Sequence, residues 1–126
     1  MEKRIIITPN APAPIGPYSQ AVLVNGTLYC SGQIAINPAT GELVQENIQA
    51  EAKQVMANIQ AVLKEANMDF GHIVKTSIFL SDMALFTEVN EVYATYFTSD
   101  FPARETVAVK TLPKNVNVEI SVIAVK

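Results

Sequence analysis

Apolar residues that recur every three or four positions predict two amphipathic helices. The first is expected over about residues 47–66, with Lys53 and Lys64 on its polar side. The second is expected over about residues 83–97, where Ser81-Asp82 supplies an N-cap. The apolar positions are Ile48, Ala52, Val55, Met56, Ile59, Val62, Leu63 and Ala66 in the first helix, and Phe86, Val89, Tyr93 and Phe97 in the second. Each helix therefore has one face to bury.

Short β-prone runs between turn residues predict the strands. Asn25-Gly26 favours a tight hairpin between the second and third runs, and residues 37–41 favour a further turn. Leu112-Pro113-Lys114-Asn115 is expected to join the last two runs as another hairpin. Three prolines make residues 11–17 a rigid, extended surface segment. The predicted strands span residues 4–8, 19–24, 27–31, 73–80, 106–110 and 116–125.

The order of these elements is typical of an α+β fold. With 126 residues the chain is long enough for one hydrophobic core, so a single domain over residues 1–126 is expected. Two helices can cover only one face of a sheet. The last strand nonetheless carries Val118 and Ile120 on one face and Ile123 and Val125 on the other. Another subunit is the economical cover for the second face, the alternative being a monomer with an apolar surface.

Composition and charge argue against several classes of function. Apolar residues make up 49% of the chain and charged residues 17%, with a formal net charge of −3. No cluster of Lys and Arg offers a basic patch to a nucleic acid. No apolar run is long enough to cross a membrane, and the first residues do not predict a secretory leader. Cys30, the one cysteine, cannot form an internal disulfide, which suits the cytosol. We expect a cytoplasmic protein.

The usual catalytic combinations of side chains are missing. The one histidine, His72, follows Gly71 at the start of a predicted strand, and we interpret it as a solvated or capping residue. Cys30 is interpreted as a small packed hydrophobic residue. One His and one Cys far apart do not make a metal site, and no Gly-rich loop leads into either helix to bind a phosphate. Neither a metal nor a cofactor is expected.

Arg104 enters an otherwise apolar strand from the turn Phe101-Pro102-Ala103. A charge there is costly unless an anion pairs with it, and a guanidinium matches a carboxylate with two hydrogen bonds. Arg104 is thus either a structural charge or a clamp for a small acid. In a symmetrical last hairpin, Arg104 would lie opposite Ile123, and the carboxylate of Glu119 opposite Ala108. A pair between the two charges would then need a bulge, a long reach or a second subunit.

Two further positions fit a small polar site. Gly32, between Ser31 and Gln33, either allows a close approach of backbone and ligand or forms a plain bulge. Tyr18 follows Gly16-Pro17, which orients it rigidly toward a ligand or into ordinary packing. Together with the two charges, these residues leave acid–base and electrostatic chemistry as the kind available.

Seven short motifs, in order and spanning nearly the whole chain, resemble the Rid (YjgF) family, most closely its archetypal reactive-intermediate deaminase group. They are Ile15-Gly16-Pro17-Tyr18-Ser19-Gln20-Ala21, Ser31-Gly32-Gln33, Ile73-Val74-Lys75-Thr76, Val89-Asn90-Glu91-Val92-Tyr93, Phe101-Pro102-Ala103-Arg104, Leu112-Pro113-Lys114 and Val118-Glu119-Ile120. The resemblance implies a chorismate-mutase-like subunit (bacillus type) with one mixed sheet and two helices on one face. It further implies a homotrimer, in which the sheets form a central barrel and ligands bind in clefts between subunits.

The resemblance also implies a reaction. Members of this group hydrolyse reactive 2-enamine and 2-imine acids, such as 2-aminoacrylate and 2-aminocrotonate, which pyridoxal-phosphate-dependent dehydratases release. The products are a 2-keto acid and ammonia, and the deaminase itself needs no cofactor. On this sequence, Arg104 would grip the substrate carboxylate, Tyr18 would line the pocket, and Glu119 would handle protons or orient water. The backbone groups expected to position water and substrate are those near Ser31, Gly32 and Thr106.

The sequence departs from the group at two positions. Thr106 stands where members often have cysteine, and Glu105, expected on the opposite strand face from Arg104, stands where they often have serine. The alternative function is a non-catalytic regulatory module that binds a small acid in the same cleft, because Arg104 would serve either purpose. Ribonuclease or translation-inhibitor activity, an older attribution in the family, is disfavoured by the acidic charge and the lack of a basic groove.

Overall fold

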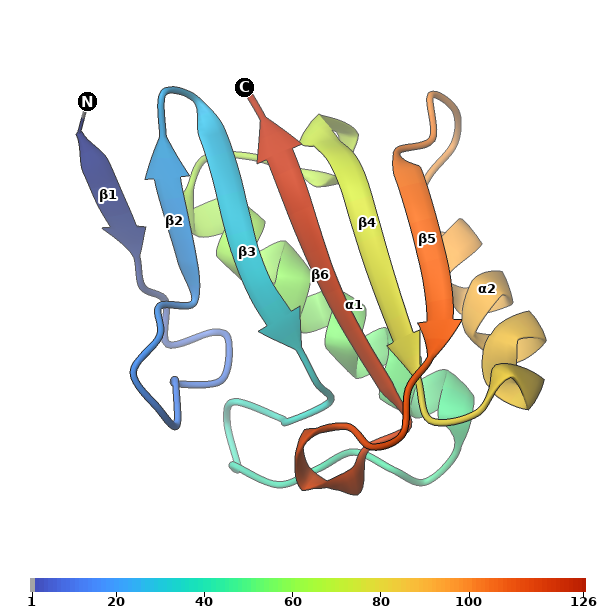
Figure 1. Cartoon of the computed structure of the whole chain (residues 1–126). Coiled ribbons are helices and arrows are strands. Elements are labelled where there is room, and N and C mark those ends of the chain that lie inside the picture. Colours follow the sequence, from blue (N-terminus) through green and yellow to red (C-terminus); the bar gives the residue numbers. More distant parts are fainter. Residues whose placement is uncertain (1) are drawn as a thin grey trace.

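The computed structural model describes residues 2–126 and shows a mixed six-stranded sheet with two helices packed against one face (Figure 1). The strands are β1 (Lys3–Ile6), β2 (Ala21–Val24), β3 (Thr27–Gln33), β4 (Ile73–Leu80), β5 (Ala103–Ala108) and β6 (Val118–Val125), and the helices are α1 (Ile48–Glu65) and α2 (Phe86–Ala94). The sheet order is β1-β2-β3-β6-β4-β5, in which β4 and β5 run parallel and the other neighbours antiparallel. The predicted α+β class is confirmed.

Both predicted helices form, but the second is shorter than expected. α1 begins close to the predicted position, and Asn47 caps it, its side chain accepting a hydrogen bond from the Ala50 amide at 2.8 Å. Asp82 caps a 3-10 turn over Met83–Leu85 rather than the helix that follows it. α2 itself ends at Ala94, earlier than the apolar spacing predicted.

The first hairpin forms as predicted, with small differences at the strand ends. Val24 pairs with Thr27 across the turn, and Asn25 and Gly26 adopt positive φ angles of 50° and 78°. β1 ends at Ile6, before the predicted limit, because its pairing with β2 ends at Ile6 and Ala21. β4 has the predicted bounds.

The predicted hairpin between the last two strands is wrong. β6 lies between β3 and β4, and β5 pairs with β4 in parallel. The helix α2 joins β4 to β5, and such a crossover returns the chain in the same direction. The four buried apolar positions of β6 suit a central strand, whereas β5 is exposed at nearly every residue and forms the sheet edge.

The predicted register of the two charged residues is wrong for the same reason. Arg104 pairs with Thr76 of β4, not with Ile123, and Glu119 pairs with Phe79, not with Ala108. The two side chains lie on opposite faces of the sheet, because Thr76 faces the buried helix side and Glu119 alternates with the buried residues of β6.

The core fills the space between the sheet and the two helices. It includes Ile6, Leu28, Val55, Met56, Ile59, Val62, Leu63, Ile78, Leu80, Val118, Ile120 and Val122. Across residues 2–126, no helix is long and apolar enough to cross a membrane.

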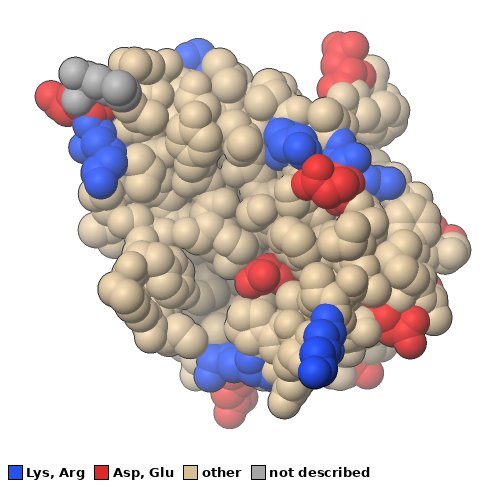
Figure 2. Space-filling model, viewed as in Figure 1, with Lys and Arg blue, Asp and Glu red and all other residues tan. Residues whose placement is uncertain are grey.

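No helix or strand among residues 2–126 covers the opposite face of the sheet. We call it the open face; its exposed apolar residues include Ile5, Tyr29, Val107 and Val125. Figure 2 shows that this face is largely uncharged, with most Lys, Arg, Asp and Glu near its rim. An apolar face of this extent is typical of a protein–protein contact.

Candidate functional site

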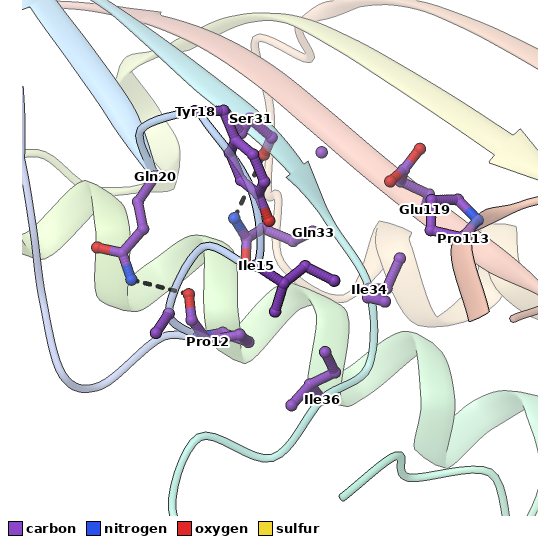
Figure 3. Close-up of a pocket in the computed structure, with 12 residues that line it drawn as sticks. Pro12, Ile15, Tyr18, Gln20, Ser31, Gln33, Ile34, Ile36, Pro113 and Glu119 are labelled. Atoms are coloured by element: carbon purple, nitrogen blue, oxygen red, sulfur yellow. Dashed lines mark hydrogen bonds between the residues drawn. The ribbon is translucent and has the colours of Figure 1, made fainter. Parts of the chain in front are cut away.

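A cavity of about 410 Å³ opens between the proline segment, the end of β3 and the start of β6 (Figure 3). Its lining is mostly apolar, with a few polar side chains, as is usual for small-molecule sites. It brings together four of the six predicted site residues, and Arg104 and Thr106 do not line it. The lining residues are Pro12, Ala13, Ile15, Tyr18, Gln20, Ser31, Gly32, Gln33, Ile34, Ile36, Pro113 and Glu119.

Gln20 holds the proline segment in place, a role that the sequence analysis missed. Its side chain is buried, and its Oε1 accepts a hydrogen bond from the Thr8 amide at 2.7 Å. Its Nε2 donates to the carbonyl oxygens of Thr8, Ala11 and Pro12 at 3.0, 3.3 and 3.0 Å. The only signal in the sequence was an amide side chain directly ahead of an apolar strand.

Tyr18 is fixed through the backbone on both sides of it. Its amide donates to the carbonyl of Gly16 at 2.9 Å. Ser31 of β3 then fixes the residues that follow, because its hydroxyl donates to the Ser19 carbonyl at 2.6 Å and its amide to the Gln20 carbonyl at 2.9 Å. About half of the Tyr18 side chain remains exposed, so the ring is available to a ligand in the cavity.

Gly32 and Glu119 form the side of the cavity opposite the proline segment. The pairing of β3 with β6 is irregular between Cys30 and Gln33, so the predicted bulge is present at Gly32. A Cβ at this position would lie 2.8 Å from Cδ and 2.9 Å from Oε2 of Glu119. The close approach that glycine allows is therefore to the Glu119 side chain. Burial raises the pKa of Glu119 above its usual value.

Arg104 lies outside this cavity, on the helix face of the edge strand. Its Nη1 donates to Oδ1 of Asn90 at 2.7 Å, and its guanidinium carbon lies 5.6 Å and 5.1 Å from the ring centroids of Phe86 and Tyr93. The expectation of a costly charge inside an apolar strand is wrong for the isolated chain, because β5 is at the edge and Arg104 is exposed. The guanidinium lines a second cavity of about 440 Å³ together with Phe101.

Thr106 follows Arg104 on the same face of β5. It pairs with Ile78 of β4, and its Oγ1 is buried without a hydrogen-bond partner among residues 2–126. Buried hydroxyls are normally bonded, so this oxygen is available to a group from outside the chain. Glu105 lies on the opposite face, as predicted, and its carboxylate forms an ion pair with Lys75 at 3.0 Å.

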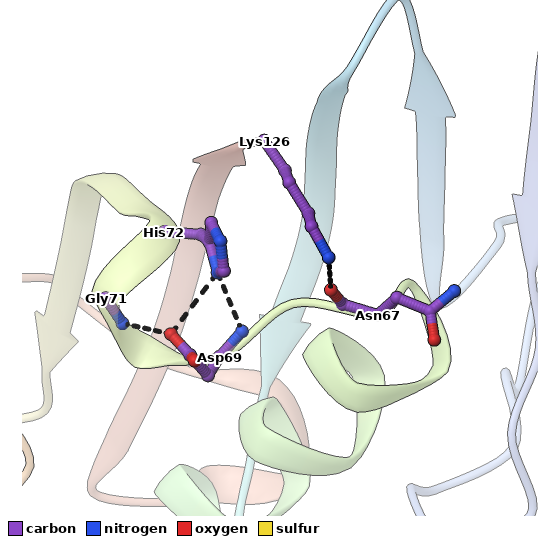
Figure 4. Close-up of polar contacts among 5 residues, drawn as sticks. All are labelled: Asn67, Asp69, Gly71, His72 and Lys126. Carbon is purple, nitrogen blue, oxygen red and sulfur yellow. Dashed lines mark hydrogen bonds and ion pairs between the residues drawn. The ribbon is translucent and has the colours of Figure 1, made fainter.

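His72 and Cys30 have the structural roles that the sequence predicted. His72 closes a short turn, its Nδ1 accepting a hydrogen bond from the Asp69 amide at 3.0 Å (Figure 4). Asp69 in turn accepts from the Gly71 amide at 2.8 Å. Cys30 packs in the core, where burial raises the pKa of its thiol to about 12. Neither residue contributes a reactive group to the cavity.

Comparison with known proteins gives the same family along nearly the whole chain. The family model described as endoribonuclease L-PSP matches residues 8–126. A solved structure from Yersinia pestis, named as a protein of unknown function of the conserved Rid protein family, superposes with a TM-score of 0.96 at 52% identity, covering 99% of this chain and 100% of that one. The chain belongs to the Rid (YjgF) family.

Relatives in the Rid family carry more than one name. A 2-iminobutanoate/2-iminopropanoate deaminase of Capra hircus is 52% identical over 98% of this chain and 90% of its own length. A putative regulator, AldR, of Lactococcus lactis is 51% identical over 96% of each chain. Membership of the Rid family therefore does not by itself decide between an enzyme and a regulatory protein.

Proposed function

We propose that the protein is a hydrolytic deaminase of 2-enamine and 2-imine acids that releases a 2-keto acid and ammonia. The observation that carries the proposal is the half-buried Glu119 in a mostly apolar cavity, where burial raises its pKa. A carboxyl group whose pKa lies closer to neutrality can both accept and return a proton. The deaminase name of the goat relative supports the same reaction.

The proposed enzyme works as a homotrimer of chorismate-mutase-like subunits with its active sites between them. The cavity contains the carboxylate of Glu119, and no cation among residues 2–126 lines it. An anionic imino acid would not bind there without a positive partner. The exposed Arg104, on the edge strand β5 of a neighbouring subunit, would supply that partner at the rim of a contact between apolar open faces.

In the proposed site each residue has a separate task. Arg104 binds the substrate carboxylate with two hydrogen bonds, and Thr106 of the same strand places its unpaired hydroxyl beside it. Tyr18 confines the rest of the substrate against the backbone at Ser31. Holding substrate and water in one orientation supplies much of the rate.

The proton transfers balance through Glu119. The imine reacts in its protonated form. Water bonds to the imine carbon, the C=N electron pair moves to the nitrogen, and the Glu119 carboxylate takes a proton from the water, which gives a neutral carbinolamine. Glu119 returns that proton to the nitrogen, and the C–N bond breaks with its electron pair leaving on ammonia. The remaining hydroxyl gives its proton to the Glu119 carboxylate and becomes the keto oxygen, and Glu119 passes this proton to the ammonia or to solvent.

A coupled assay tests the proposed reaction. A pyridoxal-phosphate-dependent dehydratase generates 2-aminoacrylate from serine, and the appearance of the keto acid is followed with and without this protein. We expect the protein to accelerate it, and Arg104→Ala to lower kcat/KM by about 100-fold or more, because two charge-assisted hydrogen bonds are lost. An unchanged rate with the wild-type protein would refute the deaminase.

The second candidate is a regulatory module that binds a small acid in the same cavity without chemistry. The regulator name of the Lactococcus lactis relative favours it. Calorimetric titration with a 2-keto acid separates the two functions: binding that needs Arg104, in a protein that leaves the coupled assay unchanged, supports the module.

A further inference from the structure

Glu51 is a buried carboxylate that lies beside the start of β6. It lies in the first turn of α1, is 1% exposed, and no Lys or Arg among residues 2–126 pairs with it. Three N–H groups bind it instead: the amides of Asn117 and Val118 donate to Oε2 at 2.8 and 3.3 Å, and the Asn117 side-chain nitrogen donates to Oε1 at 3.0 Å. The nearby helix N-terminus also favours its negative charge.

Asn117 is bound from its other side by Ser81, directly after β4. The Ser81 hydroxyl donates to Oδ1 of Asn117 at 3.0 Å, and the Ser81 amide donates to its carbonyl oxygen at 3.0 Å. We call Glu51, Asn117 and Ser81 the Glu51 network. It links α1, the end of β4 and the start of β6 through Asn117.

This network fixes the start of β6, which pairs with only one neighbouring strand. The β3–β6 ladder ends at the pair of Gln33 and Ile120, so Glu119 is paired on the β4 side but lies beyond that ladder. The loop before β6 passes through positive φ angles at Lys114 and Asn115. The Glu51 network is thus the support that lies between this loop and Glu119.

We propose that Glu51 is a positioning residue for the active site. It acts through the backbone of Asn117 and Val118 to keep the Glu119 carboxyl over Gly32, at the distance that a glycine alone permits. An apolar side chain at position 51 would fill the same space but would leave both amides unpaired. The effect of Glu51 on catalysis rests on the proposed deaminase function. Its effect on the position of the Glu119 carboxyl does not.

Glu51→Gln tests the role with little change in volume. Its amide nitrogen would face the Asn117 side-chain nitrogen, which places two donors together. We expect kcat to fall roughly 10- to 100-fold with KM little changed. We also expect the pKa of Glu119, measured by ¹³C NMR of its carboxyl, to move down toward its usual value as the group leaves its half-buried place.

In the double variant Glu51→Gln with Asn117→Asp, the new amide nitrogen at position 51 faces a carboxylate oxygen at position 117, and the other oxygen keeps the Ser81 contact. This variant should recover both kcat and the Glu119 pKa. Ile59→Val, a core change on the same helix, is the control and should alter neither readout. If Glu51→Gln does not fold, Ser81→Ala removes one outer bond and should shift the Glu119 pKa in the same direction.

Unfolding at a lower temperature with an unchanged Glu119 pKa and kcat would overturn the proposal, because the network would then be structural only. An inactive wild-type protein would refute the deaminase instead. The Glu119 pKa in the variants would still decide the positioning role in that case.

Discussion

At the scale of single residues, the geometry of the cavity depends on Gly32. A methyl group there would lie within 3.0 Å of three atoms of the Glu119 side chain. Gly32→Ala should therefore displace the carboxyl and reduce keto-acid formation roughly 10- to 100-fold. The control is Gly41→Ala, a glycine that does not line the cavity: its φ of 77° makes the change strained, yet no atom beyond its chain neighbours lies within 4 Å of the new Cβ. Full activity of Gly32→Ala beside normal folding would contradict the assigned place of Glu119.

Glu119 also makes the stability of the protein depend on pH. Burial raises its pKa in the folded state, so folding disfavours the ionised form. Stability that is present while the group is protonated is lost as the pH rises through the folded pKa. Glu119→Gln should thus be more stable than the wild type near neutral pH and lose this advantage in acid, even though its activity falls.

Thermal unfolding across the pH range measures this difference. The matched control is Glu65→Gln, a change of the same type at an exposed position of α1. It should leave the stability of the protein near neutral pH nearly unchanged. A Glu119→Gln variant that is less stable than the wild type near neutral pH would show that the ionised carboxylate is well stabilised, contrary to this account.

At the scale of elements, the proline segment forms one side of the cavity, and the side chain of Gln20 holds it in place. Gln20→Ala would leave the Thr8 amide and three carbonyl oxygens without their partner, at a cost of about 1–3 kcal/mol in the free energy of unfolding. KM should rise as well, because Tyr18 and the proline segment lose their fixed position. Chemical denaturation and the coupled assay measure both effects.

Gln60→Ala, at an exposed position of α1, is the control and should change neither stability nor KM appreciably. An equally small effect of Gln20→Ala would mean that the prolines alone keep the segment in place.

Elements with local signals were predictable from the sequence, and the strand order was not. The Asn25-Gly26 turn and the start of α1 are decided by contacts a few residues apart, and both form as predicted. The position of β6 is decided by long-range pairing with β3 and β4. A short turn before β6 favoured a hairpin, but burial of four apolar residues in the sheet centre prevailed.

The candidate site was predictable to the same extent. Tyr18, Ser31, Gly32 and Glu119 do line one cavity, as the family motifs implied. The sequence predicted that Arg104 and Glu119 are not neighbours, but from a hairpin register that does not form; their places on opposite faces of the sheet follow from the strand order. Gln20 and Glu51 act through hydrogen bonds to distant backbone groups, which have no local pattern.

At the scale of the whole molecule, two features of the isolated chain point to the same assembly. The open face exposes apolar side chains such as Ile5 and Tyr29. The cavity has an acidic group, while the cationic group suited to its substrate lies exposed on the other face of the sheet. Association of subunits would cover the open face and would bring a cationic group to the cavity. The mass in solution should be that of a trimer.

Hybrid trimers test the shared site most directly. Arg104→Ala and Glu119→Gln should each be nearly inactive alone, and they are unfolded together in equal amounts and refolded. A site made by Glu119 of one subunit and Arg104 of the next is intact only where the two different variants meet in the right order. The mixture should then regain about a quarter of the wild-type activity. If mixed trimers form by mass and activity stays at the level of the separate variants, Arg104 and Glu119 do not act across a subunit boundary, and the account of the site is wrong.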